Sequence, residues 1–282
     1  MITRRNFLRT SALASASVIL LPGCLNLARD RNEIGLQLYT VRDKISNDLA
    51  GTLKEVSRIG YSYLEAAGYS DGKFYGLPPR EFRIMAEDLG MRLVSSHVAF
   101  NPEQASQVID AHLELGVPYV VFPWMSMPEK PSHDDYANKA DLFNKLGENC
   151  KSSGLKFGYH NHNFEFVKIG DTTGYDILMK LCDPDLVFFE ADIYWMTYAQ
   201  IDPMEYIKKY KGRYNLWHVK DMENSPERSF AIIGEGIIDY GEIFKKMKNI
   251  SGMEYFFVEQ DSCKKDSLES VAISFNNLKE VL

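Results

Sequence analysis

The chain has 282 residues, of which 45% are hydrophobic and 12% aromatic, and its formal net charge is −7. This apolar content is enough for a large core and argues against a disordered chain. Nucleic-acid binding needs a basic face for the phosphate backbone, so the acidic balance argues against such a partner.

The N-terminal segment has the features of an export signal. Residues 3–9 (TRRNFLR) resemble a twin-arginine signal, and an apolar stretch follows over 11–21. At about 11 residues it is too short to span a bilayer, which needs roughly 20. Residues 21–24 (LPGC) resemble a lipobox, in which the cysteine becomes the lipidated first residue of the mature protein. We therefore expect an exported, periplasmic lipoprotein anchored to the membrane at Cys24, with an uncleaved N-terminal anchor as the alternative.

From Ile34 onward the chain repeats one unit: a helical pattern, a Gly or Asp-Pro break, and a short apolar run that ends in polar residues. Apolar runs of this kind are typical of strands buried on both faces of a parallel sheet. Eight runs are predicted to be strands: 34–39, 61–66, 91–97, 117–122, 155–162, 185–192, 214–221 and 253–261.

The segments between these runs carry helical periodicity. Leu49, Leu53, Val56 and Ile59 fall on one helix face, and the same spacing relates Leu142, Leu146 and Cys150. Six glycines precede strands where a helix is expected to end, which is typical of C-caps: Gly60, Gly90, Gly116, Gly154, Gly212 and Gly252.

Eight strand–helix units over about 250 residues favour a closed (β/α)₈ TIM barrel of the α/β class. The alternative is an open doubly wound sheet, which usually carries a glycine-rich phosphate loop after its first strand; none follows residues 34–39 here. We expect a signal peptide over 1–23, a short tether over 24–33 and a single barrel domain over 34–282.

Active sites of such barrels lie at the C-terminal ends of the strands. Successive strand residues point to opposite faces, so residues two apart share a face. His160 and His162 are one such pair at the predicted strand ends; the others are Glu190 with Asp192, His218 with Lys220, and Glu259 with Asp261. If these faces point inward, imidazoles and carboxylates from four neighbouring strands converge.

A mixed imidazole and carboxylate set predicts one bound divalent metal ion and suits Mn²⁺, Zn²⁺, Co²⁺ or Fe²⁺ better than Ca²⁺, with Mg²⁺ also open. The expected ligands are His160, Asp192, His218 and Glu259, and His162 replaces His160 if the register differs by two residues. Taken singly, such residues are more often structural; Asp239 and Asp221, for example, are expected to cap a helix and a loop.

At these residues the chain resembles the xylose isomerase-like barrel superfamily, the sugar phosphate isomerase/epimerase group. The most specific pieces are residues 159–166 (YHNHNFEF), Asp192 with Trp195, residues 217–221 (WHVKD), residues 234–236 (GEG) with Asp239, and Glu259. The resemblance implies one divalent metal held by a Glu, an Asp, a His and a second Glu. Asp192, His218 and Glu259 match the last three of these ligands, and His160 stands where many members have the first Glu, which doubles as a catalytic base in several epimerases.

The resemblance implies an enzyme that removes a proton next to the carbonyl of a sugar, keto-sugar or glycoside, giving isomerisation, epimerisation, dehydration or cleavage by elimination. The candidate catalytic residues are Glu259, Glu165 and Lys220. The candidate substrate contacts are His97, His162, Glu65, Trp195 and Trp124, with Tyr39 as a further apolar wall.

Two alternatives remain open from the sequence. One is a non-catalytic sugar-binding lipoprotein on the same barrel, which should have lost one of the matched ligands. The other is a DNA-repair endonuclease, against which the charge and the export signal argue. Export favours unphosphorylated substrates, because sugar phosphates are cytoplasmic. The sequence leaves the oligomeric state open.

Overall fold

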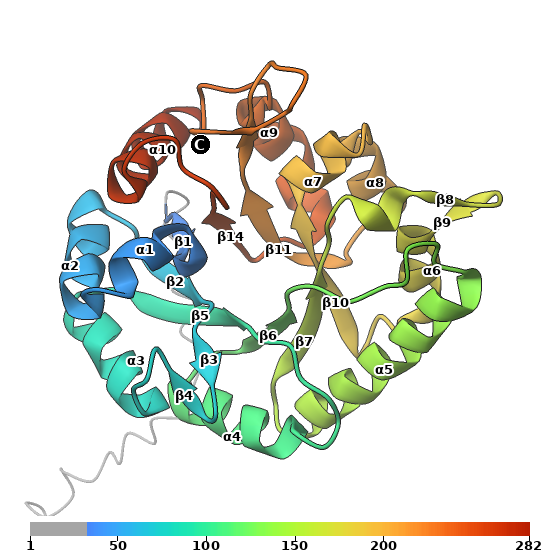
Figure 1. Cartoon of the computed structure of the whole chain (residues 1–282), viewed down its shortest axis with the longest axis horizontal. Coiled ribbons are helices and arrows are strands. Elements are labelled where there is room, and N and C mark those ends of the chain that lie inside the picture. Colours follow the sequence, from blue (N-terminus) through green and yellow to red (C-terminus); the bar gives the residue numbers. More distant parts are fainter. Residues whose placement is uncertain (1–32) are drawn as a thin grey trace, which may run out of the picture. The chain divides into compact units, whose positions relative to one another are not determined.

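Eight parallel strands close into a barrel in the computed structural model, which describes residues 33–282 (Figure 1). The barrel strands are β1 (Gly35–Gln37), β2 (Tyr63–Ala66), β5 (Arg92–His97), β6 (Tyr119–Phe122), β7 (Lys156–His160), β10 (Val187–Asp192), β11 (Tyr214–Val219) and β14 (Tyr255–Val258). Each pairs in parallel with its neighbours, and β1 closes the ring against β14. The predicted TIM barrel is therefore confirmed.

All eight strands lie within the predicted ranges, but several end earlier than expected. β7 ends at His160, β11 at Val219 and β14 at Val258. His162 and Asp261 therefore lie on loops beyond their strands, and strict strand alternation does not place them.

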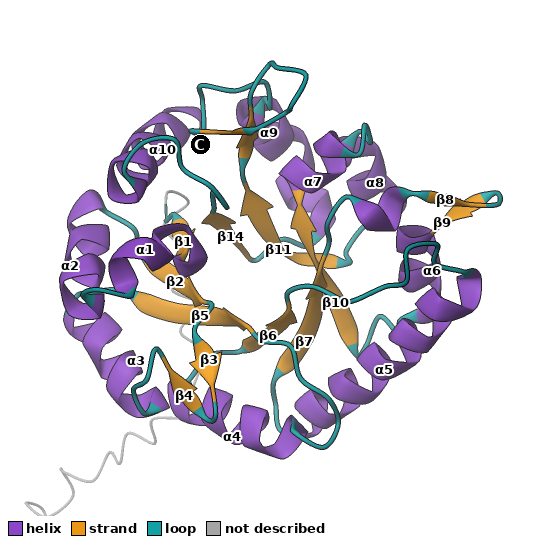
Figure 2. Cartoon of the chain, viewed as in Figure 1, coloured by secondary structure: helices purple, strands orange, loops and turns teal. Residues whose placement is uncertain are grey.

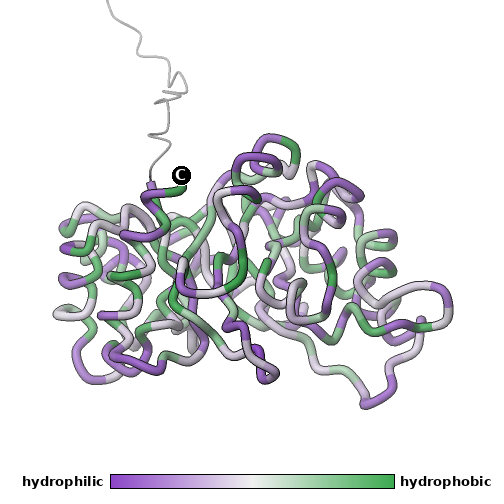
Figure 3. Tube along the Cα trace, turned by 90° about the horizontal axis from the view of Figure 1, so that it is seen from above, coloured by the Kyte–Doolittle hydropathy of each residue, from purple (hydrophilic) through white to green (hydrophobic). Residues whose placement is uncertain are grey.

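Helices surround the barrel, as Figure 2 shows in purple around the orange strands. They are α1 (Arg42–Ile45), α2 (Leu49–Ile59), α3 (Pro79–Asp88), α4 (Ala105–Leu115), α5 (His133–Ser152), α6 (Gly174–Leu181), α7 (Ile193–Tyr198), α8 (Pro203–Lys209), α9 (Tyr240–Ser251) and α10 (Ser267–Val281). The peripheral helices alternate hydrophilic and hydrophobic residues along the chain (Figure 3), as helices with one buried face do.

Helix ends follow the predicted signals. The six glycines expected at C-caps all have positive φ. Gly116, for example, ends α4 with φ 79° in the left-handed region, which residues with a Cβ rarely adopt. Asp239 caps the start of α9 by accepting a hydrogen bond from the backbone N–H of Glu242, as expected.

Two apolar clusters stabilise the fold. The larger lies between the strands and the helices, and includes Leu53 and Val56 of α2 and Leu146 and Cys150 of α5. The smaller draws its members from six strands: Tyr63, Val94, Tyr119, Val121, Phe188, Leu216, Tyr255 and Phe257. It fills part of the barrel interior and forms the floor beneath the polar residues described below.

The loops that follow the strands carry small additions. Two are the 3₁₀ helices η2 (Leu38–Val41) and η3 (Phe164–Phe166). Three are two-stranded pairs: β3 (Tyr69–Ser70) with β4 (Lys73–Phe74), β8 (Lys168–Ile169) with β9 (Thr172–Thr173), and β12 (Asp221–Met222) with β13 (Phe230–Ala231). These segments elaborate the C-terminal mouth of the barrel, where active sites of this fold lie.

The predictions for residues 1–23, the tether and the lipid anchor at Cys24 fall outside the described residues. Across residues 33–282, no helix has both the length and the apolar character needed to cross a membrane.

Candidate metal centre and active site

The barrel interior changes from apolar to ionisable toward the C-terminal ends of the strands. Phe188, Leu216 and Phe257 belong to the apolar floor. Two positions further along the chain stand Glu190 and His218, on the same strands and the same inward face, and Glu259, directly after β14; all three are buried. The apolar floor thus lies directly below a layer of acids and imidazoles.

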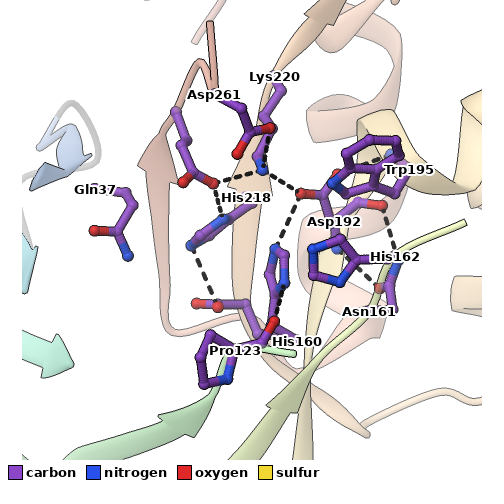
Figure 4. A network of polar contacts seen from close by, with 12 residues as sticks. Gln37, Pro123, His160, Asn161, His162, Asp192, Trp195, His218, Lys220 and Asp261 are labelled. Carbon is purple, nitrogen blue, oxygen red and sulfur yellow. Dashed lines mark hydrogen bonds and ion pairs between the residues drawn. The ribbon is translucent and has the colours of Figure 1, made fainter. Parts of the chain in front are cut away.

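Four residues from the ends of four adjacent strands converge at the mouth, and Figure 4 labels His160, Asp192 and His218 among them. One nitrogen or oxygen from each lies within 4.8 Å of the others: His160, Asp192, His218 and Glu259. We call this set the upper cluster. Its members are the four residues predicted from the sequence as metal ligands. Asp192 and His218 are direct register partners on β10 and β11, so they point to the same side of the sheet.

The His160 imidazole lies between two oxygens. Its Nδ1 is 3.2 Å from the carbonyl oxygen of Pro123, and its Nε2 is 3.0 Å from Asp192 Oδ2. Burial and the nearby His218 and His162 hold the pKa of His160 well below its ordinary value. A neutral imidazole has one N–H and cannot donate to both oxygens. A cation at Nε2, with Nδ1–H donated to Pro123, would satisfy the ring, as in many metal sites.

Asp192 is held rigidly. Its Oδ1 accepts from the backbone N–H of Trp195 at 2.8 Å and caps α7, while the Asn161 side chain bonds both the backbone N–H and the carbonyl of Asp192. Only Oδ2 therefore faces the upper cluster. This geometry gives the carboxylate one oxygen for the helix and one for a cation.

Lys220 supplies a positive charge at the same place. Its Nζ lies 2.6 Å from Glu259 Oε2 and 3.0 Å from Asp192 Oδ2. Burial raises the pKa of Glu259, but Lys220 and His218 together hold it well below the usual value. His218 Nδ1 lies 2.6 Å from the same Glu259 oxygen without the geometry of a hydrogen bond. The nitrogen and oxygen atoms of the upper cluster are thus directed at one small region.

Below it lies a second set, the lower cluster of Glu65, His97, Glu190 and His218. His218 Nε2 lies 2.5 Å from Glu65 Oε2, and His97 Nε2 lies 2.7 Å from Glu190 Oε2. Burial, followed by the nearby Glu65, raises the pKa of Glu190 to about 7. His218 belongs to both clusters, and its hydrogen bond to Glu65 holds its ring in place.

A cavity of about 450 Å³ opens over the upper cluster. Its lining comprises Tyr39, Ala67, Tyr69, His97, Val98, Ala99, Pro123, Trp124, His160, His162, Lys220, Glu259 and Asp261. Tyr39 and Trp124 are 41% and 52% exposed, which is unusual for large aromatic side chains. Burial and the nearby Lys220 lower the pKa of His162 to about 4, so this ring is neutral.

Three residues predicted to take part in catalysis or substrate binding do not line the cavity. Glu65 is buried beneath His218. Trp195 packs 5.5 Å from the His162 ring, ring centre to ring centre, and supports that residue from behind. Glu165 is fully buried; its carboxylate accepts from the backbone N–H of His162 and from the Tyr159 hydroxyl. Glu165 is therefore absent from the cavity lining and held by structural contacts, and its role as a base stays a prediction.

The motif around Asp221 is also structural. Its carboxylate accepts from the backbone N–H groups of Gly234, Gly236 and Ile238 at 2.9–3.1 Å. This confirms the expected loop cap and fixes the connection between β11 and α9 beside Lys220.

Sequence reasoning missed several members of these networks. Gln37 donates to Glu65 Oε2 at 2.8 Å, and Ser95 donates to the other oxygen of Glu65. Asn161 clamps Asp192, as described above. Gln37 ends β1, and its place at a strand end was the available signal; the partners of Ser95 and Asn161 depend on contacts that the sequence pattern does not encode.

The fold and the site together define a TIM barrel with an imidazole and carboxylate cluster at its mouth. Residues 53–278 match the xylose isomerase-like TIM barrel family, and the chain belongs to that family. A solved structure of a sugar phosphate isomerase/epimerase from Parabacteroides distasonis is 30% identical, with a TM-score of 0.77 over 88% of this chain and 93% of that one.

An inosose dehydratase from Clostridium perfringens is 29% identical over 167 residues, or 53% of this chain. The match spans 56% of that relative, so the chain covers little more than half of its length. A structure of the IOLI protein with a bound zinc atom has a TM-score of 0.69 at 16% identity, covering 88% of this chain and 97% of that one; this likeness shows the fold alone.

Proposed function

We propose that this protein is a divalent-metal enzyme that removes a proton next to the carbonyl of an unphosphorylated keto-sugar, keto-polyol or glycoside. The observation that carries the proposal is the convergence of His160, Asp192, His218 and Glu259 under a cavity, where a cation at His160 Nε2 would satisfy both contacts of that ring. Relatives named as a sugar isomerase/epimerase and an inosose dehydratase support this class of chemistry.

The metal would be held by the upper cluster. Two imidazoles and two carboxylates suit Zn²⁺, Mn²⁺, Co²⁺ or Fe²⁺ better than Ca²⁺. When bound, such an ion supplies Lewis acidity toward a carbonyl oxygen and so lowers the pKa of the neighbouring C–H. Glu65 would hold the His218 ring by accepting from Nε2, which leaves Nδ1 for the ion.

The cavity favours an uncharged substrate. Lys220 is the single Lys or Arg among the described residues that line it, and three carboxylates already surround its ammonium. Apart from Lys220 and the proposed metal, the lining therefore offers a phosphate group no Lys or Arg side chain. Exposed Tyr39 and Trp124 offer apolar faces to sugar rings, while His97 and neutral His162 offer hydrogen bonds to hydroxyls.

We assign proton removal to Glu259, because its carboxylate is ionised and lines the cavity. The α-proton would pass to that carboxylate, the C–H electron pair would form a C=C bond, and the carbonyl π pair would move onto oxygen to give an enolate. Collapse of the enolate would re-form the carbonyl and expel a β-hydroxide or β-alkoxide, which takes up the proton that Glu259 received and leaves as water or an alcohol. Reprotonation at carbon gives isomerisation or epimerisation instead. The relatives named inosose dehydratase favour elimination.

Metal analysis of protein purified without chelators, followed by NMR of candidate substrates in D₂O, tests the proposal. The panel comprises an inosose, 3-keto-glycosides and a ketose phosphate. We expect about one metal per chain and deuterium incorporation or elimination with an unphosphorylated ketone. Sugar binding without exchange or turnover for any of them would support the alternative, a sugar-binding protein.

Export is a separate proposal that rests on residues outside the described part of the chain. The arginine pair, the apolar stretch and Cys24 support a periplasmic lipoprotein. Such a location suits the uncharged substrate class, because phosphorylated sugars are cytoplasmic.

A further inference from the structure

The ammonium of Lys220 contacts the same two oxygens that the upper cluster would offer to a metal. These are Asp192 Oδ2 at 3.0 Å and Glu259 Oε2 at 2.6 Å. The lysine side chain is only 1% exposed, so solvent does little to screen its charge. A divalent ion bound to both oxygens would therefore lie next to a buried positive charge.

A third carboxylate resolves this conflict. Asp261 Oδ2 lies 3.1 Å from Lys220 Nζ, and Asp261 does not belong to the upper cluster. Its side chain is 28% exposed and lines the cavity. The guanidinium of Arg42 bonds the Asp261 backbone carbonyl at 2.8 Å and helps to fix the loop on which it stands.

We propose that Lys220 competes with the metal in the free site, and that Asp261 is the positioning residue that holds the Lys220 ammonium when the metal is bound. This inference rests on the proposed metal-dependent function. On metal entry the ammonium gives up its contacts with Asp192 and Glu259 and keeps the one with Asp261.

Charge balance supports the assignment. Asp192, Glu259 and Asp261 carry three negative charges, which one ammonium and one divalent ion neutralise when both histidines of the upper cluster are neutral. Lys220 therefore need not lose its proton for the metal to bind. The exchange also moves the ammonium toward the cavity wall, where it can donate to a substrate oxygen, such as that of a leaving group.

Zinc and cobalt affinities of the full chain, measured by competition with a chromophoric chelator, test this inference. Lys220→Met should raise affinity by about tenfold or more, since a neighbouring positive charge is removed. Asp261→Asn should lower it by about tenfold, because the displaced ammonium loses its partner. When Asp261→Asn is added to Lys220→Met, it should change metal affinity by less than about twofold relative to Lys220→Met alone, because no ammonium remains to be held. Lys264→Met, which removes an exposed lysine paired with Glu223, is the matched control and should have no effect.

The outcomes separate the two proposals. If the wild type and all variants bind no metal, the proposed function fails and this inference with it. If the wild type binds metal but Lys220→Met does not bind it more tightly, or Asp261→Asn has the same effect with and without Lys220, the inference alone is overturned. Should Lys220→Met not fold without metal, Asp261→Asn still decides, because its partly exposed site tolerates the change; unaltered affinity in that variant would refute the positioning role.

Discussion

Glu65 accepts a hydrogen bond from His218 through the ring nitrogen that faces away from the upper cluster, over 2.5 Å. A carboxylate can only accept here, so His218 Nε2 carries the proton and Nδ1 is directed at Glu259. Burial lowers the pKa of His218, but Glu190, Glu259 and Glu65 together raise it well above its ordinary value. A metal that binds Nδ1 would therefore displace a proton from the ring, and Glu65 would continue to hold the other nitrogen.

Glu65→Gln should weaken metal binding about 10–100-fold, the usual cost of losing an outer partner of a ligating histidine. The neutral amide removes the negative charge that favours a proton on His218 Nε2. The ring is then held less strongly in the tautomer that leaves Nδ1 for the ion. Chelator competition measures the loss. Glu55→Gln, on the exposed face of α2, is the control, and equal affinities in both variants would contradict the role of Glu65.

Glu165 should make stability fall as pH rises from about 4.5 to 7. Burial raises its pKa to about 7 in the folded protein, above the unfolded value, so the folded state binds the proton more tightly. This contribution is complete below the unfolded pKa and is lost as pH rises through the folded pKa.

Glu165→Gln keeps the hydrogen-bonding shape but cannot ionise. The free energy of unfolding of the wild type relative to this variant should therefore fall by roughly 3 kcal/mol across that range. Urea titrations at several pH values measure it, and the comparison cancels groups that titrate alike in both proteins. A difference that stays constant with pH would show that Glu165 is ionised in the fold.

Gly236→Ala should destabilise the loop beside Lys220. An added Cβ would lie 2.2 Å from Asp221 Oδ1 and 2.4 Å from the Met222 carbonyl oxygen, both part of a fixed network. Relief requires backbone movement, which costs about 1–3 kcal/mol. Gly241→Ala, whose Cβ would meet nothing closer than 3.4 Å, is the control and should leave the urea midpoint unchanged or slightly higher. Equal midpoints for the two variants would argue against a rigid loop.

Much of the fold was predictable because its signals are local. Strands covered on both faces read as apolar runs, and glycines mark the helix ends, so the eight units and their order follow from the sequence. The inward-pointing residues of β10 and β11 could also be predicted from the sequence, because Asp192 and His218 keep the two-residue alternation of their strands.

Residues beyond the strand ends were harder to place. Glu165 lies in the 3₁₀ helix η3, beyond the end of β7, where the two-residue alternation of strand side chains no longer applies. Its buried carboxylate accepts from the backbone N–H of His162 and from the Tyr159 hydroxyl. The pairing of β2 with β5 shifts register between Leu64 and Glu65, which the sequence pattern does not show. The three carboxylates around Lys220 meet only in the closed barrel, and the course of its long side chain depends on that packing.

Replacing Arg4 and Arg5 together by Lys should leave the precursor in the cytoplasm, because the twin-arginine pathway reads the arginine pair. Cys24→Ala should abolish incorporation of labelled palmitate while leaving the barrel folded. Cell fractionation and lipid labelling measure the two effects. A wild-type protein that is neither exported nor labelled would refute the lipoprotein proposal without bearing on the barrel site.

Glu259→Gln should reduce turnover far more than stability. The amide keeps the size of the side chain at a fully packed position, so the thermal midpoint should change little, and Lys220 retains Asp192 and Asp261 as partners. The change removes the oxygen that would accept the substrate proton, and a positioned general base contributes about 10²–10⁴-fold in rate. Assays at saturating metal separate this effect from weaker metal binding. Glu269→Gln, which changes an exposed side chain of α10, is the matched control.

Deuterium exchange at the carbon next to the carbonyl should disappear with turnover in Glu259→Gln and persist in the control. If exchange survives while product formation falls, the base lies elsewhere on the cavity wall. His162 would then be the first residue to substitute, because its ring is neutral and its buried Nδ1 has no hydrogen-bond partner among the described residues.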